Sequence, residues 1–334
     1  MTRLRKLAGK DLNPIGLGCM GLTHGYGVPP ARDDAAKVLL AALDLGYDHF
    51  DTANIYGAGR CEALIGDTLA HRRKDFFLAS KTGILFDGPK RGTDCHPDSI
   101  LKSLDASLAR LKTDHLDLFY LHRFDYTVPI ADSVGALVRA QEAGKILAYG
   151  VSEWSADHIR EAHAVHPMAA VQTEYSLWTR NVELAVLETT RELGIALVAF
   201  SPLGRGALAD GIRDTSTLLE NDIRYPHPRF DAENWPKNLA LIDRFNAIAA
   251  QNGVTPAQLS LAWVLSRGDH VHAIPGTTRL DHLAGNVAKA DWQPEAALLE
   301  QVDRLINQNT VSGPRYHAPM QKTIDTEEFA PAGA

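Results

Sequence analysis

The chain has 334 residues, 45% hydrophobic and 22% charged, which is enough to bury the core of one large α/β domain or two ordinary domains. Its net charge of −7 offers no basic surface to nucleic acid or an anionic membrane, and no apolar run approaches the roughly 18 residues of a membrane helix. Three cysteines without CxxC spacing, and a start without a signal-like apolar segment, predict a reduced, cytoplasmic protein.

Eight short apolar runs recur along the chain and predict β-strands. They are PIGLGCMG, YDHFDTA, DFFLASK, HLDLFYLH, KILAYGVSEW, MAAVQTEYS, IALVAFSP and VHAIPG. The runs lack polar alternation, as expected of strands that are covered on both faces of a parallel sheet. Amphipathic helical stretches precede several of them, and three of these stretches end at Gly46, Gly144 and Gly194. Glycine there suits the left-handed position that follows a helix.

Eight βα units in a chain of about 300 residues predict a closed (β/α)8 TIM barrel, an α/β fold that forms a single domain over residues 1–334. The first residues, LRKLAGKDLNP, predict a small hairpin at the bottom of the barrel. The alternative, a doubly wound dinucleotide fold, needs G-x-G-x-x-G between a strand and a helix. GLGCMG follows Ile15, but no helical pattern begins until about Asp33, so this match is weak. A long polar loop, rich in Pro and Arg, is expected from Gly204 to Trp235, after the seventh strand.

Polar residues close successive apolar runs, and a barrel gathers such strand ends on one rim. Asp51, Lys81 and His122 end three consecutive predicted strands, and Tyr56 lies on the turn after Asp51. A lysine beside a tyrosine favours the phenolate, and a carboxylate fixes the charge and position of the lysine. Tyr56 is therefore a candidate proton donor, and His122 a candidate for orienting the oxygen that receives the proton. Each residue alone has an ordinary structural interpretation as a cap, turn or packing residue, but the four together favour a site.

The other histidines do not have the spacing of metal ligands: His24, His96, His158, His163 and His166. No G-x-S-x-G nucleophile motif is present either, so we expect neither metal nor acyl-enzyme chemistry. A metal-dependent barrel isomerase or hydrolase is a further alternative. It needs more carboxylates and histidines at strand ends than Asp51, His122 and Glu174 supply.

Eight motifs, taken in order, resemble those of the aldo-keto reductases: GLGCMG, FDTANIYG, ASKTG, LDLFYLHR, GVSEW, VQTEYS, FSPLGRG and IPGTTR. The resemblance runs from about Leu4 to Tyr316 and is closest to the bacterial and plant group of auxin-induced-protein-like reductases. It implies a (β/α)8 barrel that binds NADPH in an extended pose and reduces aldehydes and ketones without a metal.

By position, the resemblance implies a catalytic tetrad of Asp51, Tyr56, Lys81 and His122, with Tyr56 as the general acid. It implies cofactor contacts along the whole dinucleotide. These are Met20 and Asp51 near the reacting end, Ser152 and Gln172 at the carboxamide, Phe200 stacked on the nicotinamide, Ser201, Leu203 and Arg205 along the pyrophosphate, and Gly276, Thr277, Arg279 and Asn286 around the adenosine.

Some positions depart from the animal members of the family. Glu153 stands where those reductases have asparagine, while Gly276 and His282 replace basic residues that face the 2′-phosphate. Arg279 alone then remains for that phosphate, and the expectation of NADPH rather than NADH depends on it.

The sequence therefore predicts an NADPH-dependent carbonyl reductase acting reversibly on a small-molecule carbonyl substrate, with nucleic acid and membranes excluded as partners. Two alternatives stay open: an NAD(P)-dependent aldose or alcohol dehydrogenase, and a nucleotide-binding accessory subunit of the potassium-channel type. The expected pocket lining is mainly aromatic and apolar, which favours broad aldehyde substrates over strongly anionic ones. It comprises Tyr26, Ile55, Phe86, Trp154 and tail residues near Tyr316.

Overall fold

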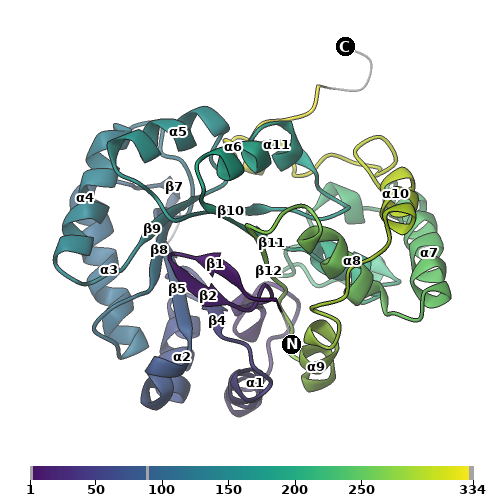
Figure 1. The fold of residues 1–334 in the computed structure, drawn as a ribbon, viewed down its shortest axis with the longest axis horizontal. Helices are drawn as coiled ribbons and strands as arrows, with labels where there is room; N and C mark the ends of the chain where they lie inside the picture. The colour runs from purple at the N-terminus through teal and green to yellow at the C-terminus, as the bar shows by residue number, and fades with distance from the viewer. Residues whose placement is uncertain (1–2, 88–89, 331–334) are drawn as a thin grey trace.

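Eight parallel strands form the inner wall of the protein (Figure 1). The computed structural model describes residues 3–87 and 90–330, without the side chains of residues 86–91. The strands are β3 (Leu17–Gly18), β4 (His49–Asp51), β5 (Phe77–Thr82), β8 (Leu118–Leu121), β9 (Tyr149–Ser152), β10 (Ala170–Glu174), β11 (Ala196–Phe200) and β12 (Val271–Ile274). A parallel bridge between Ile15 and Ala273 joins the first strand to the last and closes the ring. All eight predicted strands are present, and the predicted (β/α)8 TIM barrel is confirmed.

Helices surround the strands on the outside (Figure 1). They are α1 (Arg32–Asp44), α2 (Arg60–Leu69), α3 (Pro97–Leu111), α4 (Ile130–Glu142), α5 (Ala156–Val165), α6 (Val186–Glu192), α7 (Trp235–Gln251), α8 (Pro256–Leu265), α9 (Leu280–Val287), α10 (Ala296–Leu305) and the short α11 (Ala318–Gln321). Gly46, Gly144 and Gly194 follow α1, α4 and α6 with φ of 90°, 71° and 67°, as the helix-ending glycines in the sequence predict. No helix in the described ranges is long and apolar enough to cross a membrane.

A hairpin of β1 (Arg5–Leu7) and β2 (Lys10–Leu12) lies across one opening of the barrel (Figure 1). Its buried leucines, Leu7 and Leu12, belong to one cluster with Phe77 and Leu118, the first residues of β5 and β8. Because these strands begin at that opening, the hairpin closes the amino-terminal end of the barrel, as predicted. The carboxyl ends of the strands, where a barrel carries its chemistry, lie at the other end.

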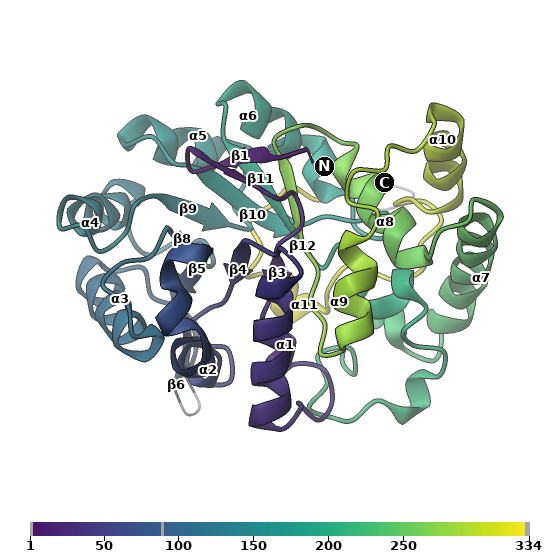
Figure 2. The same ribbon diagram turned by 60° about the horizontal axis from the view of Figure 1, so that its bottom comes forward.

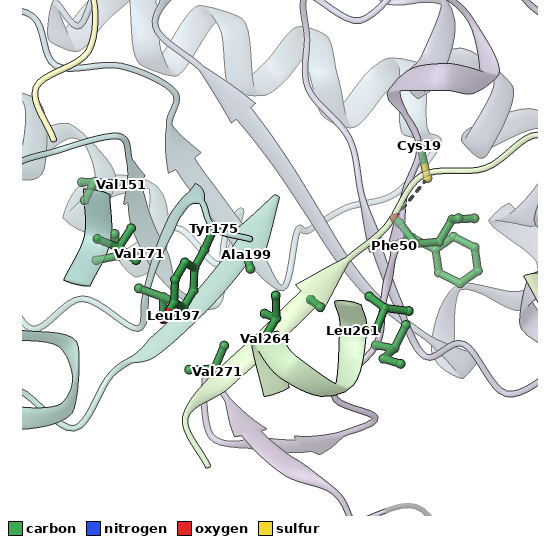
Figure 3. Packing of buried hydrophobic residues seen from close by; sticks show 14 of the residues in the cluster. Cys19, Phe50, Val151, Val171, Tyr175, Leu197, Ala199, Leu261, Val264 and Val271 are labelled. Atoms are coloured by element: carbon green, nitrogen blue, oxygen red, sulfur yellow. Dashed lines mark hydrogen bonds between the residues drawn. The ribbon is translucent and has the colours of Figure 1, made fainter. Parts of the chain in front are cut away.

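The main hydrophobic core fills the layer between the strands and the helices. Figure 3 shows part of it, with Leu197 and Val271 from β11 and β12 together with Leu261 and Val264 of α8. A capping box at Thr255 and Gln258 fixes the start of α8 and so helps to set this contact. The rigid wall that results holds the strand ends at fixed positions.

Two insertions stand at the carboxyl ends of the strands. A second hairpin, β6 (Ile84–Asp87) and β7 (Lys90–Thr93), follows β5, and Figure 2 shows β6 at the opposite end of the barrel from β1. The predicted long loop follows β11 and contains only short 3-10 turns before α7 begins at Trp235. These turns are η4 (Gly204–Ala209), η5 (Thr215–Thr217) and η6 (Pro228–Phe230). Both insertions extend the rim where the predicted site lies.

Candidate active site

Three of the four predicted catalytic residues form one hydrogen-bonded group. Asp51 is the last residue of β4, Lys81 lies in β5, and Tyr56 is on the turn before α2. The Lys81 ammonium donates to the Asp51 carboxylate, to the Thr52 carbonyl at 2.8 Å and to the Tyr56 hydroxyl at 3.4 Å. One lysine therefore joins the acid and the phenol that the sequence placed at this strand end.

His122 lies against the same phenol. It directly follows β8, and its ring meets the Tyr56 ring edge-on, with centroids 6.0 Å apart. Burial, and then Arg123 and Lys81, hold the pKa of His122 well below its usual value, so the imidazole is neutral. Its Nδ1 is buried and has no hydrogen-bond partner in the described part of the chain. A neutral imidazole beside the Tyr56 ring is suited to orienting a substrate oxygen.

The protonation states of the group follow from burial and from the charges within it. Burial raises the pKa of Tyr56 and outweighs Lys81, which lowers that pKa as expected. Burial alone would lower the pKa of Lys81, but Asp51 and Tyr56 raise it above its usual value. Tyr56 therefore keeps its proton at neutral pH beside a charged ammonium group. It can give up that proton in a reaction, because Lys81 stabilises the phenolate that remains.

The residues predicted to hold the nicotinamide lie at neighbouring strand ends. Ser152 ends β9 and pairs in register with Gln172 of β10, and Phe200 ends β11 half-buried. The Gln172 amide donates to Asp51 at 2.7 Å, which ties it to the tetrad. The Ser152 hydroxyl is buried without a partner among the described residues, so it is available to a bound group.

The loop after β11 begins in an uncommon backbone conformation. Ser201 and Arg205 have φ of 48° and 58°, and Glu153 after β9 has φ of 60°. Non-glycine residues seldom adopt such angles, and those that do gather at functional sites. Leu203 packs half-buried against the core beside them. Arg205 donates to Glu174 at 2.9 Å and to the Tyr316 hydroxyl at 2.7 Å, so the arginine predicted to face the pyrophosphate already has protein partners.

The residues predicted for the adenosine end cluster after β12. A Cβ atom at Gly276 would lie 3.1 Å from the Gly18 carbonyl oxygen, so the two strand ends approach closely there. The Thr277 hydroxyl accepts from the Arg279 amide at 3.1 Å, just before α9, and Asn286 is buried in that helix. Arg279 is exposed and makes a two-bond contact with Asp281, at 2.7 and 3.0 Å.

Met20, predicted to lie near the reacting end of the cofactor, begins a short 3-10 turn, η1 (Met20–Leu22), after β3 and is half-buried.

The residues predicted to line the substrate pocket differ in their surroundings. Trp154 is almost fully buried and packs edge-on against Phe124, with centroids 4.8 Å apart. The guanidinium of Arg224 lies 5.2 Å from the centre of the Tyr26 ring. Ile55 is half-buried, and the Phe86 side chain lies outside the described residues.

The sequence did not indicate a buried charged network beside the tetrad. Glu174 accepts from Arg205 at 2.9 Å, from Arg315 at 3.0 Å and from the Tyr316 hydroxyl at 3.0 Å. Burial opposes ionisation of Glu174, but Arg205 and Arg315 hold its pKa far below the usual value. The network ties the long loop and the chain's tail to the end of β10. Glu174 lies two residues after Gln172, on the same face of the strand. This spacing was the one local sequence feature that could have indicated a role for Glu174 at the site.

Comparison with known proteins identifies the class. The model of the aldo/keto reductase family matches residues 14–307, and the chain belongs to this family. A probable aldo-keto reductase from Glycine max is 39% identical over 311 residues, covering 92% of this chain and 90% of the relative.

Solved structures share the fold at lower identity. The glycerol dehydrogenase of Gluconobacter oxydans aligns with a TM-score of 0.83 at 26% identity over 99% of each chain. An aldo-keto reductase from Klebsiella pneumoniae in complex with NADPH aligns with a TM-score of 0.72 at 25% identity, over 95% of this chain and 99% of its own. The chain is therefore an oxidoreductase of this family, while the roles of its individual site residues stay predictions.

Proposed function

We propose that this protein is an NADPH-dependent carbonyl reductase that reversibly converts aldehydes or ketones to alcohols. The observation that supports the proposal most is the buried Asp51–Lys81 pair, whose ammonium lies 3.4 Å from the Tyr56 hydroxyl. Tyr56 gives its proton to the carbonyl oxygen, Lys81 stabilises the phenolate left behind, and His122 orients the oxygen. In the alcohol-to-carbonyl direction the same phenolate takes the proton back.

The chain's residues fit a nicotinamide cofactor. When bound, NADPH supplies the hydride that reduces the carbonyl carbon. Ser152 and Gln172 would hold the carboxamide, and the unpartnered buried hydroxyl of Ser152 supports this assignment. Phe200 would stack on the ring, and the residues after β11 and β12 would hold the pyrophosphate and the adenosine. The NADPH complex of the Klebsiella pneumoniae relative supports the choice of cofactor.

A second candidate function is alcohol or polyol oxidation, which the similarity to the Gluconobacter oxydans glycerol dehydrogenase favours. The same tetrad serves both directions. A panel of aldehydes with NADPH or NADH, and of alcohols with the oxidised cofactors, separates the two. Vigorous aldehyde reduction supports the reductase, whereas cofactor binding without turnover on any substrate supports an accessory, nucleotide-binding role.

Tyr56→Phe tests the proposed chemistry directly. We expect it to keep NADPH affinity but to lower kcat about 10²–10⁴-fold, the usual contribution of a general acid. Tyr149→Phe is a matched control, because it removes another buried hydroxyl, which lies 2.5 Å from the His166 carbonyl oxygen and 3.2 Å from that of Ala162, away from the tetrad. Turnover of Tyr56→Phe within a few-fold of the control would exclude Tyr56 as the proton donor.

A further inference from the structure

Five buried charged side chains surround the carboxyl ends of β9 and β10: Glu153, Glu174, Arg205, Arg229 and Arg315. None of these side chains is exposed by more than 9%. Arginine stays protonated in proteins, and the neighbouring arginines hold both glutamates ionised, because they lower the pKa of each below its usual value against the opposing effect of burial. Arg205 and Arg315 pair with the two carboxylates, while Arg229 donates to the carbonyl oxygens of Trp178 and Gly313, so the five side chains carry one positive charge in excess.

Arg315 is incompletely paired. Its Nε donates to Glu174 at 3.0 Å, and one terminal nitrogen donates to Glu153 at 2.5 Å. The other terminal nitrogen, Nη1, is buried and has no acceptor among the described residues. A buried charged donor without an acceptor costs free energy, which indicates that a bound molecule supplies the acceptor when the protein functions.

A second guanidinium belongs to Arg123, which stands beside Glu153 at the carboxyl ends of β8 and β9, because these strands pair in register at Leu121 and Val151, two residues before each. Arg123 follows His122 directly, is half-buried, and donates to the His122 carbonyl at 2.6 Å. It makes no ion pair with a carboxylate in the part of the chain that the structure describes. The positive charge of Arg123 contributes to lowering the pKa of Tyr56 and that of Glu153, against the opposing effect of burial. Arg123 therefore follows His122, whose ring contacts Tyr56, and stands one strand away from Glu153, the carboxylate that Arg315 binds.

We propose that the substrate is an aldehyde or ketone that carries a carboxylate, bound by Arg123 and by Nη1 of Arg315 while its carbonyl lies at Tyr56. The inference rests on the proposed carbonyl reductase function. The planar fork of a guanidinium matches the two oxygens of a carboxylate, and the excess positive charge of the rim supplies the attraction. This differs from the expectation of a mainly aromatic and apolar lining that includes tail residues near Tyr316. The structure shows the Tyr316 hydroxyl bonded to Glu174 and its ring beside Arg205 and Arg315.

The test compares 4-carboxybenzaldehyde with its neutral methyl ester at saturating NADPH. The measured quantity is the ratio of kcat/KM for the acid to kcat/KM for the ester. We expect wild type to favour the acid, and Arg123→Met to lower the ratio by about 10–100-fold, the scale of a hydrogen bond to a charged group. Arg123→Lys keeps the charge without the fork and should fall between the two.

Arg160→Met is the matched control, because Arg160 is an exposed arginine of α5 paired with Glu192 and should keep the wild-type ratio. A wild-type ratio near one, or an Arg123→Met ratio equal to that of wild type, would overturn the proposal. So would an Arg123→Met variant that raises only the KM for NADPH, since the guanidinium would then serve the cofactor. Failure to oxidise NADPH with either aldehyde would instead contradict the reductase function itself. Arg315→Lys should lower the same ratio, and thermal unfolding shows whether that buried variant folds.

Discussion

The ammonium group of Lys81 donates to the carboxylate of Asp51, and neither side chain is exposed by more than 2%. The second carboxylate oxygen accepts from Gln172 at 2.7 Å, and Lys81 donates again to the Thr52 carbonyl at 2.8 Å. Removing two charges from water is costly, and mutual attraction repays that cost only when the remaining groups are hydrogen-bonded, as they are here. The pair is therefore stable as a unit, and neither partner can be lost alone without leaving a buried charge.

Lys81→Met should lower the free energy of unfolding by about 3–5 kcal/mol, the usual cost of breaking a buried pair. The double variant Asp51→Asn with Lys81→Met leaves no buried charge, so it should be more stable than Lys81→Met alone. Urea unfolding of the three proteins measures both effects. Lys37→Met, at a solvent-exposed pair with Asp34, should change stability little. A double variant no more stable than the single would show that the charge of Asp51 is tolerated without Lys81.

The strand ends could be predicted from the sequence because apolar runs and the residues that close them are local patterns. Asp51, Lys81 and His122 each follow such a run, and a barrel brings all of its strand ends to one rim. The charged network had no comparable signal. Arg315 lies 162 residues from Glu153 and 141 residues from Glu174 along the chain, and only the folded path of the tail brings them together.

Two further features of the site depend on tertiary contacts in the same way. The sequence indicated that Lys81 lowers the pKa of Tyr56, which it does, but the opposing effect of burial depends on packing from distant segments. Arg205 also has protein partners that no local pattern indicated, Glu174 and Tyr316, whose positions depend on a separate strand and on the tail. Its contact with a pyrophosphate stays a prediction. The residue types indicated the chemistry of each side chain. The groups that compete for it could not be predicted, because tertiary contacts bring them together.

Two histidines inside the barrel should make the protein less stable in acid. His49 and His272 are fully buried, and burial is the main cause that lowers the pKa of each to about 3. In the unfolded chain their pKa returns to about 6.5. The unfolded state then binds more protons below that pH, so stability is complete above about pH 6.5 and falls as the pH decreases toward 3.

At about pH 5, each histidine should cost on the order of 2 kcal/mol of stability relative to neutral pH. Urea unfolding of wild type, His49→Asn and His272→Asn at about pH 7.5 and pH 5 measures this. Each variant should lose less stability than wild type between the two pH values, whatever its stability at neutral pH. An unchanged pH dependence in both variants would show that other groups cause the acid sensitivity.

The loop from Gly204 to Trp235 should become more protected when NADPH binds. Arg205 uses one terminal nitrogen for both of its protein contacts, which leaves further N–H groups for a pyrophosphate. Charge-assisted bonds to phosphate would hold the loop closed, and its contact with Tyr316 would extend the effect to the tail. Amide hydrogen exchange with and without NADPH tests this, with helix α3 as an internal reference. Equal exchange in the loop under both conditions would contradict closure.

The choice between NADPH and NADH should depend on the competition of Asp281 with phosphate for Arg279. Both side chains are more than 60% exposed, and their two bonds, at 2.7 and 3.0 Å, occupy Nε and one terminal nitrogen of the guanidinium, which a 2′-phosphate would compete for. Arg279 stands at the start of α9, where free backbone amides also favour an anion. Gly276 provides no second cation, so Arg279 should carry most of the discrimination.

Arg279→Ala should weaken NADPH binding about tenfold or more and leave NADH binding nearly unchanged, because only NADPH carries the 2′-phosphate. Asp281→Ala should act in the opposite direction, since it frees the guanidinium and removes a negative charge near the phosphate. Fluorescence titration of wild type and both variants with each nucleotide measures these affinities. Equal losses for both nucleotides in Arg279→Ala would mean that Arg279 supports the adenosine site in general. A wild type that binds NADH more tightly would contradict the proposed cofactor, and unaltered NADPH affinity in Asp281→Ala would show that this carboxylate does not compete.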